Sequence, residues 1–339
     1  MSHRWVLDLV ERVGAVAAGA TVTVAVADTE AGSETDVDAD AVAEWCRRTG
    51  NQLVELRGTL ATVRRGRADP LAELAGLPAG QRPGTRLWLY TNFDCNLACD
   101  YCCARSSPHA DRRALGLDRV RRLAAEAAGA GVTELLLTGG EPFLLPDIDE
   151  LANACTAQLP TTLLTNGMLL RGRRLDALRR MDRARLAVQI SLDSPTPELH
   201  DRHRGSGSWS RTLAGIRTAA EEGFRVRVAA TLPVGLTSDV EPFHAFLDSL
   251  GIARADQIIR PLAHRGAADH GLTLTLESLV PEVTVTADGV YWHPVSADHD
   301  DHLVTTTLFP LASAIAEVRR LFAEHRARAT AAAQWFPCA

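Results

Sequence analysis

Four of the seven cysteines in this sequence stand between positions 95 and 103. Three of them, Cys95, Cys99 and Cys102, follow the spacing C-x3-C-x2-C directly after an apolar run. Three thiolates on one short loop can each bind one iron of a [4Fe–4S] cube and leave the fourth iron open. A metal centre needs an open position to bind a substrate or cofactor directly. A structural zinc ion needs a fourth ligand, and two adjacent residues such as Cys102 and Cys103 rarely bind one ion.

Short polar motifs follow three further apolar runs. They are Gly139-Gly140-Glu141-Pro142, Thr165-Asn166-Gly167 and Ser191-Leu192-Asp193. Two glycines let a backbone approach a ligand closely, and Glu141 supplies an anionic acceptor for an ammonium group. Arg204 follows in the segment HDRHRG, and its forked guanidinium suits a carboxylate.

Alternating apolar strands and Arg/Ala-rich helices position these motifs. Strands are predicted at 86–93, 132–139, 161–167, 186–193, 225–232 and 256–263, and helices at 117–130, 147–158, 172–181, 208–222 and 239–250. Six such repeats predict a parallel sheet with helices outside it, closed or partly closed as a barrel. Ligands bind at the carboxyl ends of the strands in such folds, and each motif lies at the end of a predicted strand or directly after it.

The cysteine motif, with Tyr101 before its last cysteine, resembles the radical S-adenosylmethionine (radical SAM) superfamily over roughly residues 86–260. The resemblance implies a partial (β/α)6 barrel with one [4Fe–4S] cluster, bound by Cys95, Cys99 and Cys102. It implies reductive cleavage of SAM to methionine and a 5′-deoxyadenosyl radical, which abstracts a substrate hydrogen. It also assigns SAM contacts: Gly139, Gly140, Glu141 and Pro142 to the amino group, Asn166 to the ribose region, Ser191 as a polar contact, Arg204 to the carboxylate and Tyr101 to the adenine.

Residues 1–66 are predicted to form a small α+β domain. Its elements are a helix at 5–17, a strand at 21–27, a helix at 36–50 and a hairpin over 51–66. The region resembles the sulfur-carrier (TusA-like) fold, whose carrier cysteine lies in a C-P-x-P segment before the first helix. No cysteine stands there, so a docking or substrate-presenting role and a packing role are both open. Cys46, on the second predicted helix, is interpreted as a core residue, and 67–84 is a linker rich in Pro, Gly and Ala.

The barrel is expected over 85–270 and a short α+β cap over 271–339. The cap resembles a degenerate SPASM or twitch extension, with two antiparallel strands within 272–295 and a helix at 309–334. Such extensions usually hold auxiliary clusters through several cysteines. The four remaining cysteines are too few and too scattered for two such clusters, so a single cluster is expected; they are Cys46, Cys103, Cys155 and Cys338. Cys155 is interpreted as a core residue.

Two residues are candidates for the chemistry at the substrate. Cys338, beside Trp335 and Phe336, is positioned to give a hydrogen atom or proton to a substrate radical, although a tail cysteine without a role is the alternative. His293 is a candidate acid or base, as are His264 and Tyr291. The Asp/His-rich run that follows, at 296–303, matches the spacing of no recognised metal site.

Composition excludes several function classes. The 339 residues are 46% hydrophobic and 23% charged, ordinary values for a globular protein, and the net charge of −6 argues against a nucleic-acid binder. Every basic residue is Arg, which excludes a lysine Schiff base, a pyridoxal-phosphate anchor and a P-loop lysine. No apolar run reaches a membrane span of roughly 18 residues, and the first residues lack signal-peptide features. An odd cysteine count fits a reducing compartment, so a cytoplasmic location without membrane partners is expected.

The sequence therefore predicts a radical SAM enzyme that tailors a peptide or a small metabolite. The electron donor is expected to be a flavodoxin or ferredoxin, and a protein partner could dock on the TusA-like domain. Two alternatives belong to other classes. One is a non-catalytic iron–sulfur or zinc binding module, which has no need for the motifs after the cysteines. The other is a sulfur-relay adaptor, which requires a persulfide on Cys46.

Overall fold

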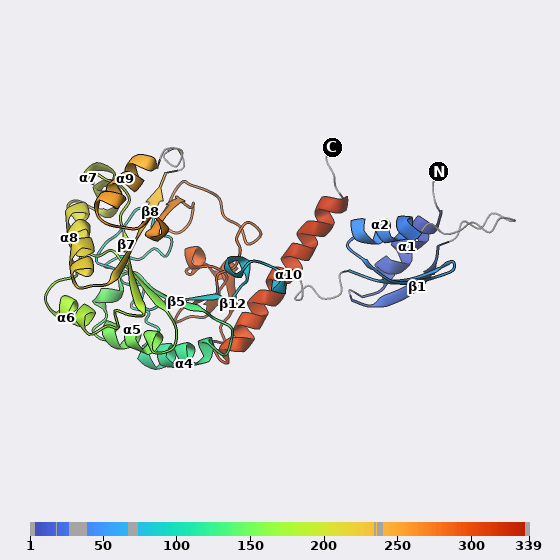
Figure 1. Cartoon of the computed structure of the whole chain (residues 1–339), viewed down its shortest axis with the longest axis horizontal. Helices are drawn as coiled ribbons and strands as arrows, with labels where there is room; N and C mark the ends of the chain where they lie inside the picture. The colour runs from blue at the N-terminus through green and yellow to red at the C-terminus, as the bar shows by residue number, and fades with distance from the viewer. Residues whose placement is uncertain are drawn as a thin grey trace. The chain divides into compact units, whose positions relative to one another are not determined.

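The computed structural model describes residues 4–17, 19–26, 39–66, 74–233, 235 and 240–335 (Figure 1). The chain separates into two compact units, one of residues 1–77 with 319–339 and the other of residues 78–318. The long helix α10 (Leu311–Trp335) contains the division at residue 319 and agrees with the helix predicted at 309–334. Each unit is described by itself.

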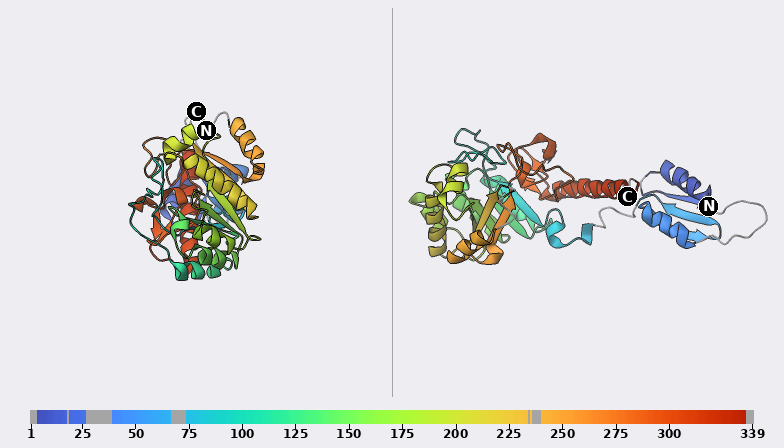
Figure 2. Two further views of the ribbon diagram at one scale, coloured as in Figure 1. Left: turned by 90° about the vertical axis from the view of Figure 1, so that its left-hand side faces the viewer. Right: turned by 90° about the horizontal axis from the view of Figure 1, so that it is seen from above.

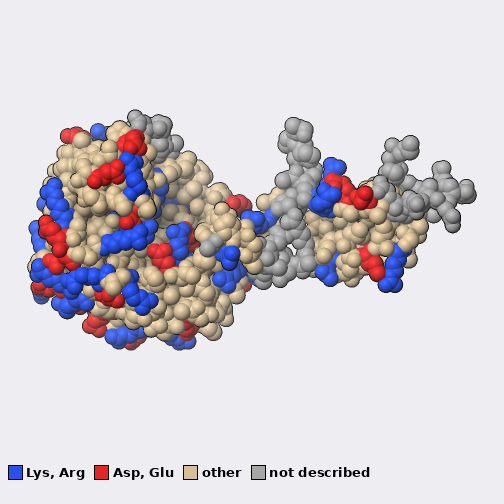
Figure 3. All heavy atoms as spheres, in the orientation of Figure 1, with Lys and Arg blue, Asp and Glu red and all other residues tan. Residues whose placement is uncertain are grey.

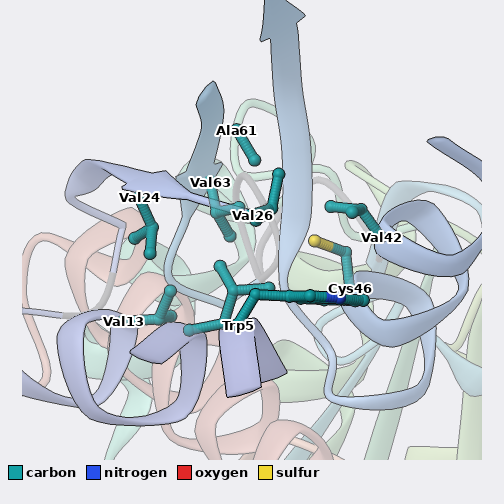
Figure 4. Packing of buried hydrophobic residues seen from close by; sticks show 9 residues of the cluster. Trp5, Val13, Val24, Val26, Val42, Cys46, Ala61 and Val63 are labelled. Carbon is teal, nitrogen blue, oxygen red and sulfur yellow. The ribbon is translucent and has the colours of Figure 1, made fainter. Parts of the chain in front are cut away.

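The smaller unit is an α+β arrangement around one apolar core. Its elements are α1 (Arg4–Ala15), β1 (Thr21–Ala25), α2 (Ala39–Arg48), β2 (Gln52–Arg57) and β3 (Leu60–Arg64). The three strands pair antiparallel in the order β1-β3-β2. Trp5, Leu9 and Val13 recur every four residues, so one face of α1 is apolar and is buried. They pack in one cluster with Val24, Val42 and Val63 (Figure 4).

Cys46 belongs to that core, as predicted. It is 2% exposed and lies beside Trp5 in the cluster (Figure 4). Burial raises the pKa of the Cys46 thiol to about 11, so it is protonated at neutral pH. A buried, protonated thiol is a poor sulfur acceptor, which disfavours the sulfur-relay alternative. The resemblance of this unit to the TusA-like fold stays a prediction.

The larger unit is built on a nine-stranded sheet with the order β12-β11-β10-β4-β5-β6-β7-β8-β9. Six strands run parallel in chain order: β4 (Arg86–Tyr90), β5 (Glu134–Thr138), β6 (Thr161–Thr165), β7 (Leu186–Ser191), β8 (Arg225–Leu232) and β9 (Gln257–Pro261). Each lies within a predicted strand. The predicted parallel strand–helix repeat is confirmed.

The helices connect consecutive strands and lie on the outside of the curved sheet (Figures 1 and 2). They are α4 (Leu117–Ala127), α5 (Ile148–Thr156), α6 (Arg173–Arg179), α7 (Pro197–Arg204), α8 (Ser208–Glu221) and α9 (Glu241–Ser249). Five of the six were predicted. The exception is α7, where no helix was predicted from the sequence. Cys155 is fully buried in α5, which confirms its interpretation as a core residue.

The two faces of the parallel sheet differ in burial, as alternating side chains require. Val188, Ile190 and Val228 are buried on the face that packs against helices such as α8. On the opposite face, Ser191 and Thr231 are only half-buried. The inner face therefore presents partly accessible polar groups near the carboxyl ends of the strands.

The segment expected as a separate cap joins the same sheet. β10 (Thr284–Val285) pairs parallel with β4, and β11 (Val290–Tyr291) and β12 (Leu303–Thr305) continue antiparallel from it. The two predicted antiparallel strands are β10 and β11. Across the described residues, no helix has the length and apolar character needed to cross a membrane.

Charged side chains of both signs alternate over the face of the larger unit seen in Figure 3. Many form exposed ion pairs between helices or within one helix, for example Arg121–Glu150, Arg179–Glu222 and Arg254–Glu241. Exposed pairs of this kind contribute little to stability. Neighbouring carboxylates thereby offset the positive charge of these arginines.

Gly215 lets α8 pack closely against the loop after β6. A Cβ at this position would lie 2.0 Å from the carbonyl oxygen of Gly167, in the loop after β6. We expect Gly215→Ala to push α8 from that loop and to lower the free energy of unfolding by about 1–3 kcal/mol, measured by chemical denaturation. Gly14→Ala in α1 is the control, since a Cβ there meets nothing within 4 Å. Equal stability of Gly215→Ala and the wild type would contradict the backbone contact.

Candidate functional site

The cysteine loop leaves the end of β4 and brings its three sulfurs near one another. Cys95 is buried, and Cys99 and Cys102 are half-buried. Burial raises the pKa of Cys95 to about 12 and that of Cys99 to about 11, and the neighbouring sulfurs add to both shifts. Two backbone N–H groups already point at sulfur: Leu97 donates to Cys95 Sγ at 3.4 Å and Ser106 to Cys102 Sγ at 3.3 Å.

This donor set fits an iron–sulfur cluster. Thiolates are the ligands of such clusters, each binding its own iron, and N–H groups directed at the sulfurs are a usual part of the site. In the described ranges, no three His, Cys, Asp or Glu side chains are arranged to hold a single metal ion. That includes the Asp/His-rich run at 296–303.

The loop after β5 packs directly on the loop after β4. A Cβ at Gly139 would lie 2.3 Å from Asn92 Oδ1, and one at Gly140 would lie 2.2 Å from the carbonyl oxygen of Asp94. The N–H groups of Gly140 and Glu141 donate to the carbonyls of Asn92 and Asp94 at 2.9 and 3.0 Å. The two glycines are therefore required by the neighbouring backbone, a reason that the sequence analysis missed.

The Glu141 carboxylate ties the loops after β5 and β6 together. It is completely buried and accepts hydrogen bonds from the N–H groups of Phe143 and Asn166 and from the Thr165 hydroxyl, at 2.8–3.0 Å. Burial raises the pKa of Glu141, and these donors oppose the rise. Among the described residues, nothing donates to the carbonyl oxygens of Gly139 and Gly140. Those two carbonyl oxygens are therefore free to accept hydrogen bonds from a ligand.

Asn166 links the loop after β6 to the cysteine loop. Its side-chain amide donates to Asn96 Oδ1 at 2.8 Å and its Oδ1 accepts from the N–H of Met168 at 2.9 Å. Its carbonyl accepts from Thr212 in α8 at 3.0 Å. Pro142 begins the short 3-10 helix η2 (Pro142–Leu144) and is buried. The motifs that follow β5 and β6 thus both contact the cysteine loop.

Asp193 connects the cysteine loop to α7 and β8. Its carboxylate is 1% exposed and accepts two hydrogen bonds from Arg204, at 2.6 and 3.2 Å. It also accepts from the Tyr101 hydroxyl and from the N–H of Thr231, the latter at 3.0 Å. Burial alone would raise the pKa of Asp193, but the charge and hydrogen bonds of Arg204 outweigh it and lower the pKa.

The ion pair with Asp193 holds Arg204 against the cysteine loop. Its guanidinium carbon is 5.3 Å from the centroid of the Tyr101 ring, and its positive charge opposes the rise in the Cys99 pKa. His203, its neighbour in α7, contacts Asp100 through its ring nitrogen at 2.9 Å. Arg204 and Tyr101 were predicted to share one site, but Asp193 was not predicted to be their common partner. The sequence feature that could have indicated this is the position of Asp193 itself, an acidic residue at the end of the motif after β7.

The remaining candidates lie in different surroundings. Ser191 is half-buried on the inner face of β7, and its hydroxyl makes no hydrogen bond within the described part of the chain. His293 accepts at Nδ1 from the N–H of Val295, and burial lowers its pKa to about 3, which disfavours acid or base catalysis near neutral pH. Tyr291 is buried and His264 exposed. Cys338 lies outside the described residues.

Comparison with known proteins agrees with this geometry. A family model described as the radical SAM superfamily matches residues 89–250, which contain the cysteine loop and the motifs after β5, β6 and β7. This part of the chain is similar to the radical SAM superfamily. The cofactors of this superfamily are a [4Fe–4S] cluster and S-adenosylmethionine, the two that the cysteine motif predicted.

Curated relatives match this chain over part of its length. An AdoMet-dependent heme synthase of Methanosarcina barkeri is 36% identical over 140 residues, which cover 41% of this chain and 40% of that protein. A PqqA peptide cyclase of Ruegeria pomeroyi is 35% identical over 164 residues, covering 48% and 43%. The chain thus spans less than half the length of these relatives.

Solved structures share the radical SAM fold. Native anSMEcpe with bound AdoMet and the Kp18Cys peptide has a TM-score of 0.55 at 13% identity, covering 70% of this chain and 82% of that one. Streptococcus suis SuiB bound to the precursor peptide SuiA has a TM-score of 0.50 at 18% identity, covering 80% and 54%. The predicted partial barrel is confirmed.

The buried Asp193–Arg204 pair predicts a large effect of removing one charge. Asp193→Asn keeps the shape but leaves the Arg204 charge buried without a counter-ion, so we expect unfolding to become easier by about 3–5 kcal/mol. Asp176→Asn is the matched control, because Asp176 forms an exposed pair with Arg179 at 3.5 Å. That variant is expected to lose less than about 1 kcal/mol. Similar losses in both variants, measured by denaturant titration, would rule out a special role for the buried pair.

The same pair predicts a pH dependence. Since the pKa of Asp193 is lowered in the folded state, its contribution to stability is present above the ordinary aspartate pKa of about 3.9 and is lost on acidification. We expect the stabilities of the wild type and Asp193→Asn to differ most near neutral pH and to converge as the pH falls below about 4. A difference that stays constant from pH 7 to pH 3 would contradict this assignment.

Proposed function

We propose that this chain is a radical SAM enzyme that uses one [4Fe–4S] cluster to cleave S-adenosylmethionine and to abstract a hydrogen from a peptide or a small metabolite. When bound and reduced, the cluster supplies the electron for cleavage of SAM to methionine and a 5′-deoxyadenosyl radical. The observation that carries the proposal is the direct hydrogen bonding of three motif loops to the cysteine loop. These links are Glu141 to Asp94, Asn166 to Asn96, and Asp193 to Tyr101.

In this proposal, Cys95, Cys99 and Cys102 bind three irons, and the strand ends hold SAM. The carbonyl oxygens of Gly139 and Gly140 accept from the amino group of SAM, with Glu141 and Pro142 fixing the loop. The Arg204 guanidinium faces the carboxylate with the donors that Asp193 leaves free. Ser191, Asn166 and Tyr101 supply the remaining contacts. The unpartnered Ser191 hydroxyl and glycine carbonyls support this assignment.

Peptide substrates are our first choice for this site. Two relatives are named for a peptide substrate or product. They are the PqqA peptide cyclase and the subtilosin biosynthesis protein AlbA of Bacillus subtilis, which is 34% identical over 140 residues. The structural neighbours anSMEcpe and SuiB are both described with bound peptides. A small metabolite is the alternative, because heme synthases and GTP 3′,8-cyclases also match.

The partners and location of the enzyme are further parts of the proposal. Reduction of the cluster needs a one-electron donor, for which a flavodoxin or ferredoxin is proposed. The smaller unit is proposed to dock a protein or substrate partner and not to carry sulfur, because Cys46 is buried in its core. A reducing, cytoplasmic location suits a reduced iron–sulfur cluster.

The alternative of a non-catalytic binding module makes a different prediction. It needs the cysteine loop alone and gives no reason for Glu141, Asn166 and Asp193 to be joined to that loop. Reductive SAM cleavage separates the two directly, because a module without SAM chemistry produces no 5′-deoxyadenosine.

We expect the protein, reconstituted anaerobically with iron and sulfide, to bind about four irons per chain and, with dithionite, to convert SAM to 5′-deoxyadenosine and methionine. The triple variant Cys95→Ala/Cys99→Ala/Cys102→Ala is expected to lose the iron and the cleavage. Cys103→Ala is the matched control and is expected to keep its iron, since Cys103 is not a ligand in the proposal. Zinc in place of iron, or a cluster that does not cleave SAM, would falsify the proposed activity.

A further inference from the structure

Ser106 has a buried hydroxyl without a hydrogen-bonding partner, beside the last cysteine of the loop. The residue is 5% exposed, and its Oγ accepts from and donates to no group of the described chain. A buried hydroxyl left unpaired costs about 1–3 kcal/mol. Such a group calls for a partner at that position.

The backbone places Ser106 between the first and third cysteines. Its own N–H donates to Cys102 Sγ at 3.3 Å. The carbonyl of the next residue, Ser107, accepts from the N–H of Cys95 at 3.1 Å, and Ser107 also bridges Asp94. The segment therefore runs along the cysteine loop, with the Ser106 backbone beside Cys102 and the Ser107 backbone beside Cys95.

A strained turn directs Ser106 to this place. Arg105 has a φ of +49°, in the left-handed region that residues other than glycine rarely adopt. Its N–H donates to the carbonyl of Cys102 at 3.1 Å, so the chain turns back on itself within four residues. Backbone strain of this kind persists where the surrounding contacts fix it, often at functional sites.

A second loop holds the turn from outside. The N–H of Ala267 donates to the Cys102 carbonyl at 2.9 Å, and a Cβ at Gly266 would lie 2.2 Å from that same oxygen. The turn that leads to Ser106 is thus held by backbone contacts from a separate segment of the chain.

We propose that the Ser106 hydroxyl donates a hydrogen bond to a sulfide of the cluster beside Cys102, and so raises the reduction potential of the cluster. The Ser106 N–H already supplies one such bond to Cys102. A donor to sulfur stabilises the reduced cluster more than the oxidised one, because reduction adds negative charge. Ser106 is a positioning and tuning residue. The inference rests on the proposed binding of a cluster by Cys95, Cys99 and Cys102.

The test compares variants with and without a hydroxyl at this position. Ser106→Thr and Ser106→Val have the same shape and differ in that one group, and Ser106→Ala removes the hydroxyl without adding volume. Ser107→Ala is the control in the same loop, because its half-buried hydroxyl accepts from the N–H of His109. Each protein is reconstituted anaerobically, its iron is counted, and its midpoint potential is measured without SAM by titration followed by electron paramagnetic resonance.

We expect the potentials of Ser106→Ala and Ser106→Val to be more negative than that of the wild type. Ser106→Thr and Ser107→Ala are expected to keep the wild-type potential. Loss of iron from the Ala and Val variants with retention in the Thr variant would also support a need for the hydroxyl. If the Thr and Val variants do not fold, the midpoint potentials of Ser106→Ala and the wild type are compared, and that difference tests the proposal.

Equal potentials with and without the hydroxyl, at equal iron content, would overturn the proposal. Loss of iron from all three Ser106 variants would also overturn it, because the position would then serve packing alone. Failure of the proposed function is distinguishable, since the wild type itself would then bind no four-iron cluster or would not cleave SAM.

Discussion

The geometry of the site depends on one buried carboxylate. Asp193 accepts hydrogen bonds from the cysteine loop, from α7 and from β8, and so joins two segments outside the sheet to one of its strands. An ionised carboxylate is stable in this position because Arg204 neutralises it and the remaining donors satisfy its oxygens. Asp193 thereby helps to orient Tyr101 and α7 against the cysteine loop, together with the contacts between His203 and Asp100.

Glu141 fixes the other side of the site by different means. Its partners are neutral N–H and hydroxyl donors and not a guanidinium, so burial raises its pKa where that of Asp193 is lowered. Both carboxylates are buried and are hydrogen-bonded to groups of the protein. Contacts to a ligand therefore fall to groups that remain unsatisfied, such as the carbonyls of Gly139 and Gly140 and the hydroxyl of Ser191.

Much of the larger unit could be predicted from the sequence, because buried parallel strands are uninterrupted apolar runs and their connecting helices are amphipathic. Short elements could not. α7 is eight residues of mostly polar side chains, and only Pro197 at its start marked it as a helix. β10 and β11 have two residues each, too few for a periodic pattern.

Residue types at the site were predictable and their pairings were not. The cysteine spacing and the motifs after the strands identified Cys95, Glu141 and Arg204 as members of one site. That Arg204 pairs with Asp193, and that Glu141 bonds to the loop after β6, depends on distances set by the whole barrel. The role of Ser106 depends on the left-handed turn at Arg105, for which the sequence has no glycine signal.

The position of β4 in the sheet has a consequence for how the protein is made. β4 carries the cysteine loop and is an interior strand, with β5 on one side and β10 on the other. The contact of Arg86 with Glu282 on that second side joins residues 196 positions apart in the sequence. Pairing at such separation is slow to form. During translation, the strand that bears the cysteines therefore leaves the ribosome early but remains paired on one side only until almost the whole larger unit has been synthesised.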